Sequence, residues 1–376
     1  MSGNQELLRV STPEVGDREL HYLKEALNRG EISSQGSFVR DFEDRFAKFV
    51  GSKFALTTSN GTTALHLALL AAGIKEGDEV IVPSITFIAT ANAVKYIGAV
   101  PVFVDIHDTY WCMDELAISS LITEKTKGII PVHIYGHPAN MDPILKIAKE
   151  HNLVVVEDAA EAHGARYRNR IVGNLGHAGI FSFYGNKILT TGEGGILVTD
   201  SESIYEKAKL LRDHGADPEK RFWHSVVGYN YRMTNLQAAL GMAQMEKFEE
   251  FLKKREKISE IYQDLLISED MISFQEPQNW ADSVCWVFTI LINCDVIDFR
   301  DNLIRHLREK QIETRPIFYP IHKMPPYEGT SSLEHTGFTN SEYVSAHGIS
   351  LPTSVTMTED DIRRVSKEVK DYISRL

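Results

Sequence analysis

Cysteine is scarce in this chain of 376 residues, which contains only three. Cys112, Cys285 and Cys294 show no CxxC spacing, so the sequence indicates neither a disulfide framework nor a cysteine zinc site. We interpret them as small hydrophobic side chains without a function. His133 and His137 lie four residues apart, but they follow a predicted strand and need not share a helix face, so we expect no metal site.

Long apolar runs and basic stretches are missing too. No uninterrupted apolar segment approaches the roughly 20 residues that span a bilayer. The opening stretch MSGNQELLRVSTPE lacks a basic region followed by an apolar one, so we expect no signal peptide. Forty basic and 52 acidic side chains give a formal net charge of -12, which disfavours binding to nucleic acid or an anionic membrane. We therefore expect a cytoplasmic protein in which any phosphorylated ligand has a local site.

The glycine-rich signatures GxGxxG and GxxxxGK are absent as well, which argues against a protein that binds a nicotinamide cofactor or a nucleoside triphosphate. The content of 43% hydrophobic and 24% charged residues is that of an ordinary globular protein. Because the chain is longer than most single cores grow, we expect two domains. A change of pattern predicts a large domain over 1–245, including an N-terminal segment 1–30, and a smaller α+β domain over 246–376.

Between residues 50 and 200, short β-branched runs alternate with segments of helical period. We expect strands at 54–57, 79–82, 100–104, 128–130, 153–156 and 196–198, and helices at 62–72, 88–97 and 143–150. This alternation predicts an α/β fold with a mostly parallel sheet covered by helices on both faces. In such sheets ligands bind at the carboxyl ends of the strands.

The smaller domain has a different pattern. We expect a charged helix over 247–261, a strand over 287–291 and a closing helix over 358–375. The apolar positions of the closing helix share one face, as a helix packed on a sheet requires. These elements predict a separate α+β unit.

The segment Asn60-Gly61-Thr62 follows the first predicted strand and opens a helix. Free N–H groups and the positive end of the helix dipole would meet there, which suits a phosphate. Gly61 lets the backbone approach closely, and the Thr62 hydroxyl can add a hydrogen bond. Asparagine and threonine are also ordinary helix caps, and on local sequence the cap alone is the stronger reading.

Two further side chains follow strands at the same predicted edge. Asp158 ends a hydrophobic run, where an unpaired carboxylate is costly and a protonated pyridine nitrogen would keep it ionised. A cap for the following turn is an equal alternative. Phe87 offers a flat aromatic face, or else packs in the core.

Lys187 lies between the aromatic stretch SFYGN and the glycine-rich stretch TGEGG. A lysine held in such a turn suggests an amine that forms a Schiff base, although an ordinary loop lysine is the common alternative. An amine, an acid, an aromatic face and a phosphate cup together describe a site for pyridoxal phosphate.

The order of five segments carries a family resemblance: SNGTTALHLAL, EVIVPSITFIATANAV, VVVEDAAEAHGA, FSFYGNKILTTGEGG and GYNYRMTNLQAAL. It resembles the sugar aminotransferases of the DegT/DnrJ/EryC1/StrS family over nearly the whole chain. The resemblance implies the type I fold of pyridoxal phosphate (PLP) enzymes. It also implies PLP as cofactor, a nucleotide-linked 4-keto-6-deoxy sugar as substrate, L-glutamate as amino donor, and a homodimer.

Residue by residue, the resemblance implies that Lys187 forms the Schiff base, Asp158 pairs with the pyridinium nitrogen and Phe87 stacks on the ring. Glu161 stands where many relatives have glutamine, and it would lie near the phenolic oxygen of the cofactor. A carboxylate beside a phenolate is unfavourable, so Glu161 would have a raised pKa or share a proton.

The resemblance also implies a phosphate site built by two subunits. Gly61, Thr62 and Ser182 would hold the phosphate from one subunit, and Asn230 would reach it from the neighbouring one. Relatives that replace the lysine with histidine are dehydratases, whereas this chain keeps Lys187, which favours transamination. In that reaction the freed lysine moves a proton between the α-carbon of the donor and C4′ of the cofactor.

Four residues are candidates for substrate contacts. Arg232 and Arg315 could bind the donor carboxylate or the sugar diphosphate, because a guanidinium fits both, and a structural role is equally open. Tyr319 and His322 are candidates for the nucleotide-sugar pocket on resemblance. Alternative functions are amination of a UDP- or dTDP-linked ketosugar, and a PLP-binding regulatory protein without catalysis.

Overall fold

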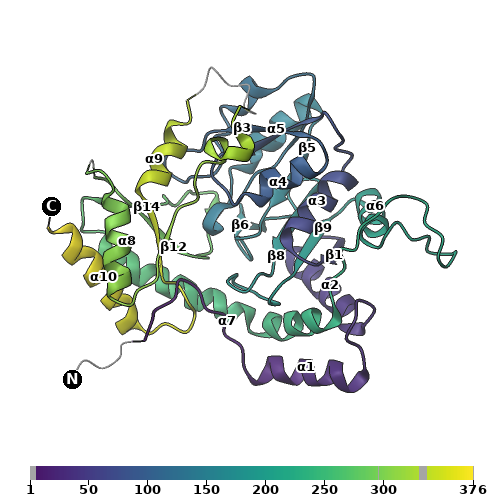
Figure 1. Cartoon of the computed structure of the whole chain (residues 1–376), viewed down its shortest axis with the longest axis horizontal. Coiled ribbons are helices and arrows are strands. Elements are labelled where there is room, and N and C mark those ends of the chain that lie inside the picture. The colour runs from purple at the N-terminus through teal and green to yellow at the C-terminus, as the bar shows by residue number, and fades with distance from the viewer. Residues whose placement is uncertain (1–5, 295, 330–336, 376) are drawn as a thin grey trace.

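A seven-stranded sheet lies at the centre of the described part of the chain, residues 6–294, 296–329 and 337–375 of a computed structural model (Figure 1). Its strands, in spatial order, are β1 (Phe54–Thr58), β9 (Gly195–Thr199), β8 (Ala178–Ser182), β5 (Val154–Asp158), β4 (Thr126–Ile129), β2 (Glu79–Pro83) and β3 (Val100–Val104). Only β9, among these strands of the described residues, runs antiparallel to its neighbours. The predicted mostly parallel sheet is confirmed.

All six strands expected in this sheet are present, and the sequence analysis missed the seventh, β8. Its sequence AGIFS starts with alanine and glycine, both of which have low strand propensity. Burial on both faces explains why it is a strand nevertheless, since all of its residues are buried. This omission matters because β8 carries Ser182.

Helices cover both faces of the large sheet, as predicted. One face packs against α3 (Gly61–Ala71), α4 (Ala89–Tyr96) and α6 (Glu202–Arg212), and the other against α2 (Ser37–Val50) and α5 (Met141–His151). Each face therefore has its own buried apolar cluster, and the two clusters clamp the sheet between them. In the described residues, no helix is both long and apolar enough to cross a bilayer.

The helix α7 (Asn235–Leu266) is continuous across the domain boundary predicted at 245. Thr234 and Gln237 form a capping box at its start, which explains why the helix begins well before the charged stretch recognised in the sequence. Its first half packs against α1 (Asp17–Arg29) and α2, and α10 (Glu359–Ile373) also packs against it. The two-domain division therefore remains a proposal, with α7 shared by both parts.

The C-terminal part contains a second sheet, β10 (Ile272–Phe274), β12 (Phe288–Ile292), β14 (Gly348–Leu351) and β13 (Arg315–Pro316), in that order. Its strands pair antiparallel, and α8 (Phe299–Glu309) and α10 share its apolar cluster. The predicted closing helix is confirmed, with Ile362, Val365, Val369 and Ile373 buried on one face. A further small sheet joins β11 (Ala281–Asp282), β6 (Arg166–Tyr167) and β7 (Arg170–Ile171).

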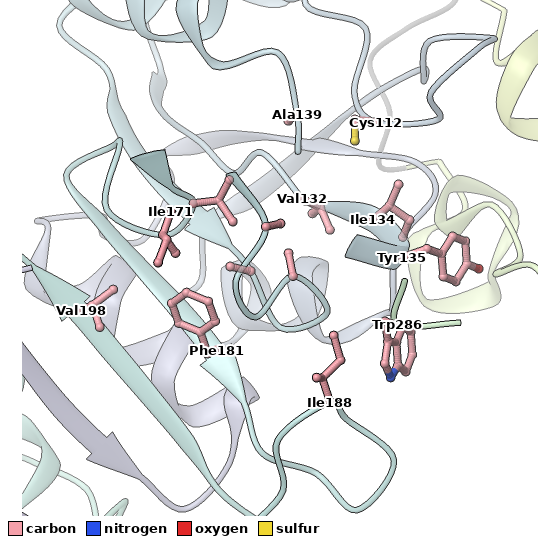
Figure 2. Packing of buried hydrophobic residues seen from close by; sticks show 14 of the residues in the cluster. Cys112, Val132, Ile134, Tyr135, Ala139, Ile171, Phe181, Ile188, Val198 and Trp286 are labelled. Atoms are coloured by element: carbon pink, nitrogen blue, oxygen red, sulfur yellow. The ribbon is translucent and has the colours of Figure 1, made fainter. Parts of the chain in front are cut away.

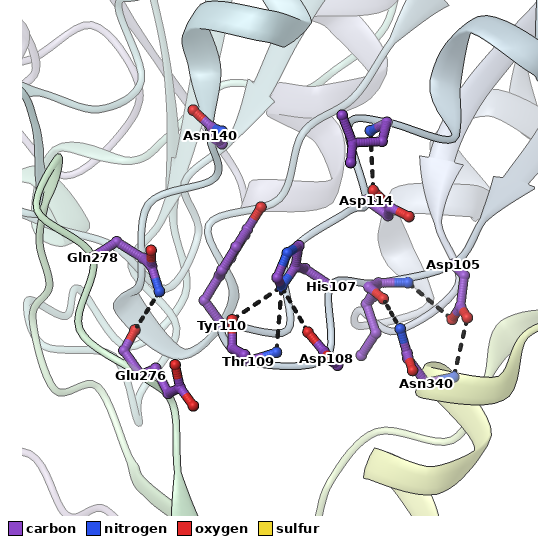
Figure 3. Close-up of polar contacts among 12 residues, drawn as sticks. Asp105, His107, Asp108, Thr109, Tyr110, Asp114, Asn140, Glu276, Gln278 and Asn340 are labelled. Carbon is purple, nitrogen blue, oxygen red and sulfur yellow. Dashed lines mark hydrogen bonds and ion pairs between the residues drawn. The ribbon is translucent and has the colours of Figure 1, made fainter.

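Polar contacts join the two parts. The N–H of Asn340, on α9 (Thr339–His347), donates to Asp105 at 3.0 Å, and its side chain donates to the carbonyl of Ile106 at 2.9 Å (Figure 3). Near the N-terminus, Leu8 forms a β-bridge with Ile312 of the C-terminal part. The start of segment 1–30 thus contacts the smaller part, although the sequence placed it with the large one; residues 1–5 lie outside the described residues.

Candidate active site

The carboxyl ends of β1 and β8 meet the start of β9 where the glycines of the sequence motifs lie. In the sheet, Gly195 pairs with both Thr58 and Ser182, so it connects the ends of β1 and β8. A Cβ on Gly195 would lie 2.4 Å from Asn60, and one on Gly61 would lie 2.9 Å from the Cβ of Ser182. Glycine at both positions therefore lets the start of α3 touch Ser182.

This contact builds a cup that fits a phosphate. The Asn60 side chain accepts the N–H of Thr63 at 2.9 Å, so Asn60 is the helix cap that the sequence suggested. The first N–H groups of a helix have no acceptor inside it, so those of Gly61 and Thr62 are available to a ligand at this end of α3, where Gly61 touches Ser182. The donors and the dipole of α3 suit a dianionic ligand.

Asp158 lies at the end of β5 and is only 7% exposed. Thr90 on α4 donates its hydroxyl to one carboxylate oxygen at 2.8 Å, and the N–H of Ala160 donates to the other at 3.2 Å. The carboxylate is thus both a turn cap and an oriented, buried acid. Burial raises the pKa of Asp158, and these hydrogen bonds together with Lys187 oppose the rise. A cationic ring nitrogen fits this environment.

Lys187 is the buried amine of the site, with a side chain 11% exposed. Its Nζ lies 3.4 Å from Oε1 of Glu161 and 3.6 Å from the centroid of the Trp286 ring. Burial lowers the pKa of Lys187, opposed by the carboxylates of Glu161 and Asp158. Burial also raises the pKa of Glu161, so both members of the pair are shifted toward their neutral forms. A less protonated lysine is a better nucleophile.

Backbone hydrogen bonds fix the lysine loop, residues 183–194. The N–H of Lys187 donates to Tyr184 at 2.9 Å, and the N–H of Phe183 donates to Gly194 at 2.8 Å. The carbonyl of Asn186 accepts from the Ser11 hydroxyl at 2.9 Å and from the Trp286 indole at 2.8 Å. The ordinary loop lysine considered in the sequence analysis would not need this support.

Four candidate residues lie where the loop after β2, which carries Phe87, meets the segment 315–322 of the C-terminal part. Phe87 is 58% exposed, so it is no core residue, and its ring lies 6.0 Å from that of Phe318. Arg315 lies near enough to Lys187 to lower the pKa of that amine. Tyr319 is exposed. His322 contacts Ser84 at 2.7 Å and stacks on Phe338, so much of its ring is engaged in packing.

Asn230 and Arg232 lie apart from this group, on the arm, which we define as residues 213–232. Arg232 pairs with Asp213 and donates to the Asn230 side chain at 2.9 Å. Among the described residues, neither side chain forms a hydrogen bond or an ion pair with Lys187. The neighbouring Tyr231 is closer to the phosphate cup, because its carbonyl accepts a hydrogen bond from the N–H of Ser59. The arm extends beyond α6 at the right of Figure 1.

Comparison with known proteins decides the family. The pattern that describes the DegT/DnrJ/EryC1/StrS aminotransferase family matches residues 13–370. The chain belongs to this family. It is 45% identical to the GDP-perosamine synthase of Caulobacter vibrioides over 95% of this chain and 96% of that one. It is 40% identical to that of Escherichia coli O157:H7, over 97% and 98%.

The fold comparison agrees. An X-ray structure of an aminotransferase from Psychrobacter cryohalolentis is 30% identical, with a TM-score of 0.90 over 97% of this chain and 98% of that one. The predicted type I fold and PLP cofactor are confirmed, and the protein is a PLP-dependent sugar aminotransferase. The buried amine, oriented acid and phosphate cup fit that cofactor.

Several residues around the candidate site were missed in the sequence. Thr90, which orients Asp158, follows Phe87 by one helical turn, a spacing that could have suggested it. Tyr135 and Trp286 gave no local signal, because tertiary packing alone brings Trp286 to Lys187 and Tyr135 to Trp286 and Glu161. His163 lies between the rings of Phe181 and Phe183, and burial lowers its pKa to about 3.

Proposed function

We propose that this aminotransferase converts GDP-4-keto-6-deoxy-D-mannose into GDP-perosamine in the cytoplasm, with L-glutamate as amino donor and 2-oxoglutarate as the second product. The buried Lys187 between Glu161 and Asp158 is the observation that carries the transamination chemistry. The choice of sugar rests on the names of the relatives, the first of which is 45% identical over nearly the full length.

The chain's own residues divide the work around the cofactor. Bound PLP supplies an electron sink for the carbon that loses a proton. Asp158, held by Thr90, keeps a positive charge at the ring nitrogen favourable. Lys187 moves the proton to and from the carbon beside the amino nitrogen, and its lowered pKa favours the form that accepts it. Phe87 presents its exposed face to the ring.

The substrates require anion recognition from both parts of the chain. We assign Arg315 and Arg232 to the donor carboxylate or the sugar diphosphate, since a guanidinium binds either in a bidentate manner. Tyr319 and His322 belong to the nucleotide-sugar pocket in this proposal, next to Arg315 on the same segment. Glu161 would lie near the phenolic oxygen of bound PLP, where its raised pKa would allow it to be protonated or to share a proton.

The enzyme acts as a homodimer in this proposal, with Asn230 reaching the phosphate bound by the other subunit. Its place on the exposed arm, away from Lys187 of its own chain, supports this role. Mixing the inactive Lys187→Ala and Asn230→Ala variants tests it, because each mixed dimer would hold one intact site. Random mixing should restore roughly a quarter of wild-type activity; no recovery under conditions that exchange subunits would refute the shared site.

A direct assay tests the sugar. Purified enzyme, PLP and L-glutamate are incubated with GDP-, UDP- and dTDP-linked 4-keto-6-deoxy sugars, and 2-oxoglutarate is measured together with the mass of the amino sugar. We expect turnover of the GDP sugar with kcat/KM at least about tenfold above the others. Preference for a UDP or dTDP sugar would overturn the substrate and leave the reaction class intact.

A further inference from the structure

The amine of Lys187 has an aromatic neighbour to which the proposed function gives no role. Its Nζ lies over the ring of Trp286, 3.6 Å from the centroid. Trp286 is buried, and water therefore does not screen the attraction between the cation and the face of the indole. In the described residues the amine thus has two partners, the indole face and the Glu161 carboxylate at 3.4 Å.

Two contacts orient the Trp286 indole, and a third holds the backbone of the same residue. Its Nε1 donates to the carbonyl of Asn186 at 2.8 Å, so the ring is tied to the residue that precedes the lysine. The backbone carbonyl of Trp286 accepts a hydrogen bond from the buried guanidinium of Arg255 on α7. The ring of Tyr135 lies nearly parallel to the indole, at 15° and 6.1 Å between centroids. A side chain that only filled space would need no such set of contacts.

Tyr135 links the two partners of the amine, as Figure 2 helps to show with Tyr135 and Trp286 side by side. Its ring stacks on Trp286, while its backbone N–H donates to Oε2 of Glu161 at 2.9 Å. The backbone of Tyr135 is left-handed, with φ of 54°, which is rare for an aromatic residue. Such strain persists where the surroundings impose it, and it is frequent at functional sites.

We propose that Trp286 is a positioning residue that holds the amine of Lys187 whenever the lysine is free of the cofactor, and that Tyr135 couples the indole to Glu161. This inference rests on the proposed role of Lys187 as the reacting amine. A free lysine side chain has four rotatable bonds and many rotamers. A contact that fixes the position of its amine therefore keeps Nζ close to the carbon that exchanges the proton. The contact should therefore act on kcat rather than on KM for glutamate.

The first test measures the amine itself in the full-length apoprotein. Lysines are labelled in short pulses with formaldehyde and cyanoborohydride across a pH series, and the peptide containing Lys187 is quantified by mass spectrometry. Because the indole stabilises the ammonium form, Trp286→Leu should move the midpoint of labelling to lower pH. Below that midpoint, labelling should become about fivefold faster. Easier access alone would speed labelling equally at every pH.

Two variants make the test specific. Trp286→Phe keeps a smaller aromatic face and should lie between wild type and Trp286→Leu, which also guards against a leucine variant that folds poorly. Trp280→Leu removes an indole that packs on Tyr110 and His137, away from the lysine, and should behave as wild type. Unchanged midpoints in both Trp286 variants would overturn the proposal.

The holoenzyme provides the second readout. Trp286→Leu should lower kcat by about tenfold, Trp286→Phe by less, and KM for L-glutamate should stay within about twofold in both. A rise in KM at constant kcat would contradict a role in holding the amine. Failure of the proposed sugar assignment would appear separately. The wild-type enzyme would then be inactive on the GDP sugar, while the midpoint of Lys187 labelling would still differ between wild type and the Trp286 variants.

Discussion

The lysine loop and the arm differ in how far their side chains are buried and held by other parts of the chain. The lysine loop is pinned by its own backbone, by Ser11 and by Trp286, and its reactive side chain is buried. The arm exposes apolar side chains, with Phe222 83% and Val227 90% exposed. Apolar exposure of this kind is typical of a surface that meets another protein. We therefore expect the chain to build the reactive half of its site alone and, in the proposed homodimer, to present the arm to the second subunit.

The largest effect should come from the centre of the lysine loop. Lys187→Ala removes the amine that moves the proton, so turnover should fall by at least about 10³-fold, measured as 2-oxoglutarate release. Folding should be unchanged by circular dichroism. Lys209→Ala, on the exposed face of α6, is the control and should keep full activity. An active Lys187→Ala variant would end the distinction between a catalytic loop and an arm.

Asp158→Asn should lower kcat by about 10²-fold, since a charge-assisted contact to the ring nitrogen is lost. In the apoprotein the same change should raise Tm at neutral pH. Burial raises the pKa of Asp158 in the folded state above 3.8, the ordinary value that applies to the unfolded chain. The contribution of Asp158 to stability is therefore fully present below pH 3.8 and is lost as the pH rises through the folded-state pKa. Thermal scans across pH check this: the gain should vanish near pH 4, and a gain of equal size there would contradict it.

Glu161→Gln should have a smaller effect, with kcat within about tenfold of wild type, because an amide can still accept the Tyr135 N–H. The carboxylate of Glu161 opposes the lowering of the Lys187 pKa by burial. Its loss should therefore make Lys187 more reactive at neutral pH in the apoprotein, measured by the labelling assay. Slower labelling would show that the carboxylate does not stabilise the ammonium.

The smallest effect on folding should come from the arm. Val227→Ser should change the free energy of unfolding of a subunit by no more than about 0.5 kcal/mol, because the side chain is exposed. The same change should weaken dimerisation, seen as a rise in the concentration at which subunits dissociate in sedimentation. Leu116→Ser, at an exposed position outside the arm, is the matched control. Equal dissociation of both variants would remove the arm from the interface.

The sequence predicted those features whose signal is local. β-branched runs marked six strands of the large sheet, whereas β8 escaped because Ala178 and Gly179 conceal a strand that only burial creates. The start of α7 was missed because its Thr234 cap precedes any charged pattern. The boundary at 245 consequently fell inside a helix.

The site shows the same division. Lys187 and Asp158 lie next to motifs of glycine and of β-branched residues, so their places could be inferred. Trp286 could not, since it meets Asn186 across 100 positions of sequence and through packing alone. The role proposed for Asn230 came from the resemblance alone, because it requires a second subunit, which a single sequence does not contain.

The continuity of α7 also constrains how the enzyme opens and closes. A helix of 32 residues is about 48 Å long, and between Met242 and Leu266 it has neither proline nor glycine at which to bend. It acts as a stiff rod fastened to both parts, so a wide hinge rotation between them would have to break it. We therefore expect substrate entry to depend on shape changes in short segments near Arg315 and Tyr319, the proposed substrate contacts, rather than on bending of α7.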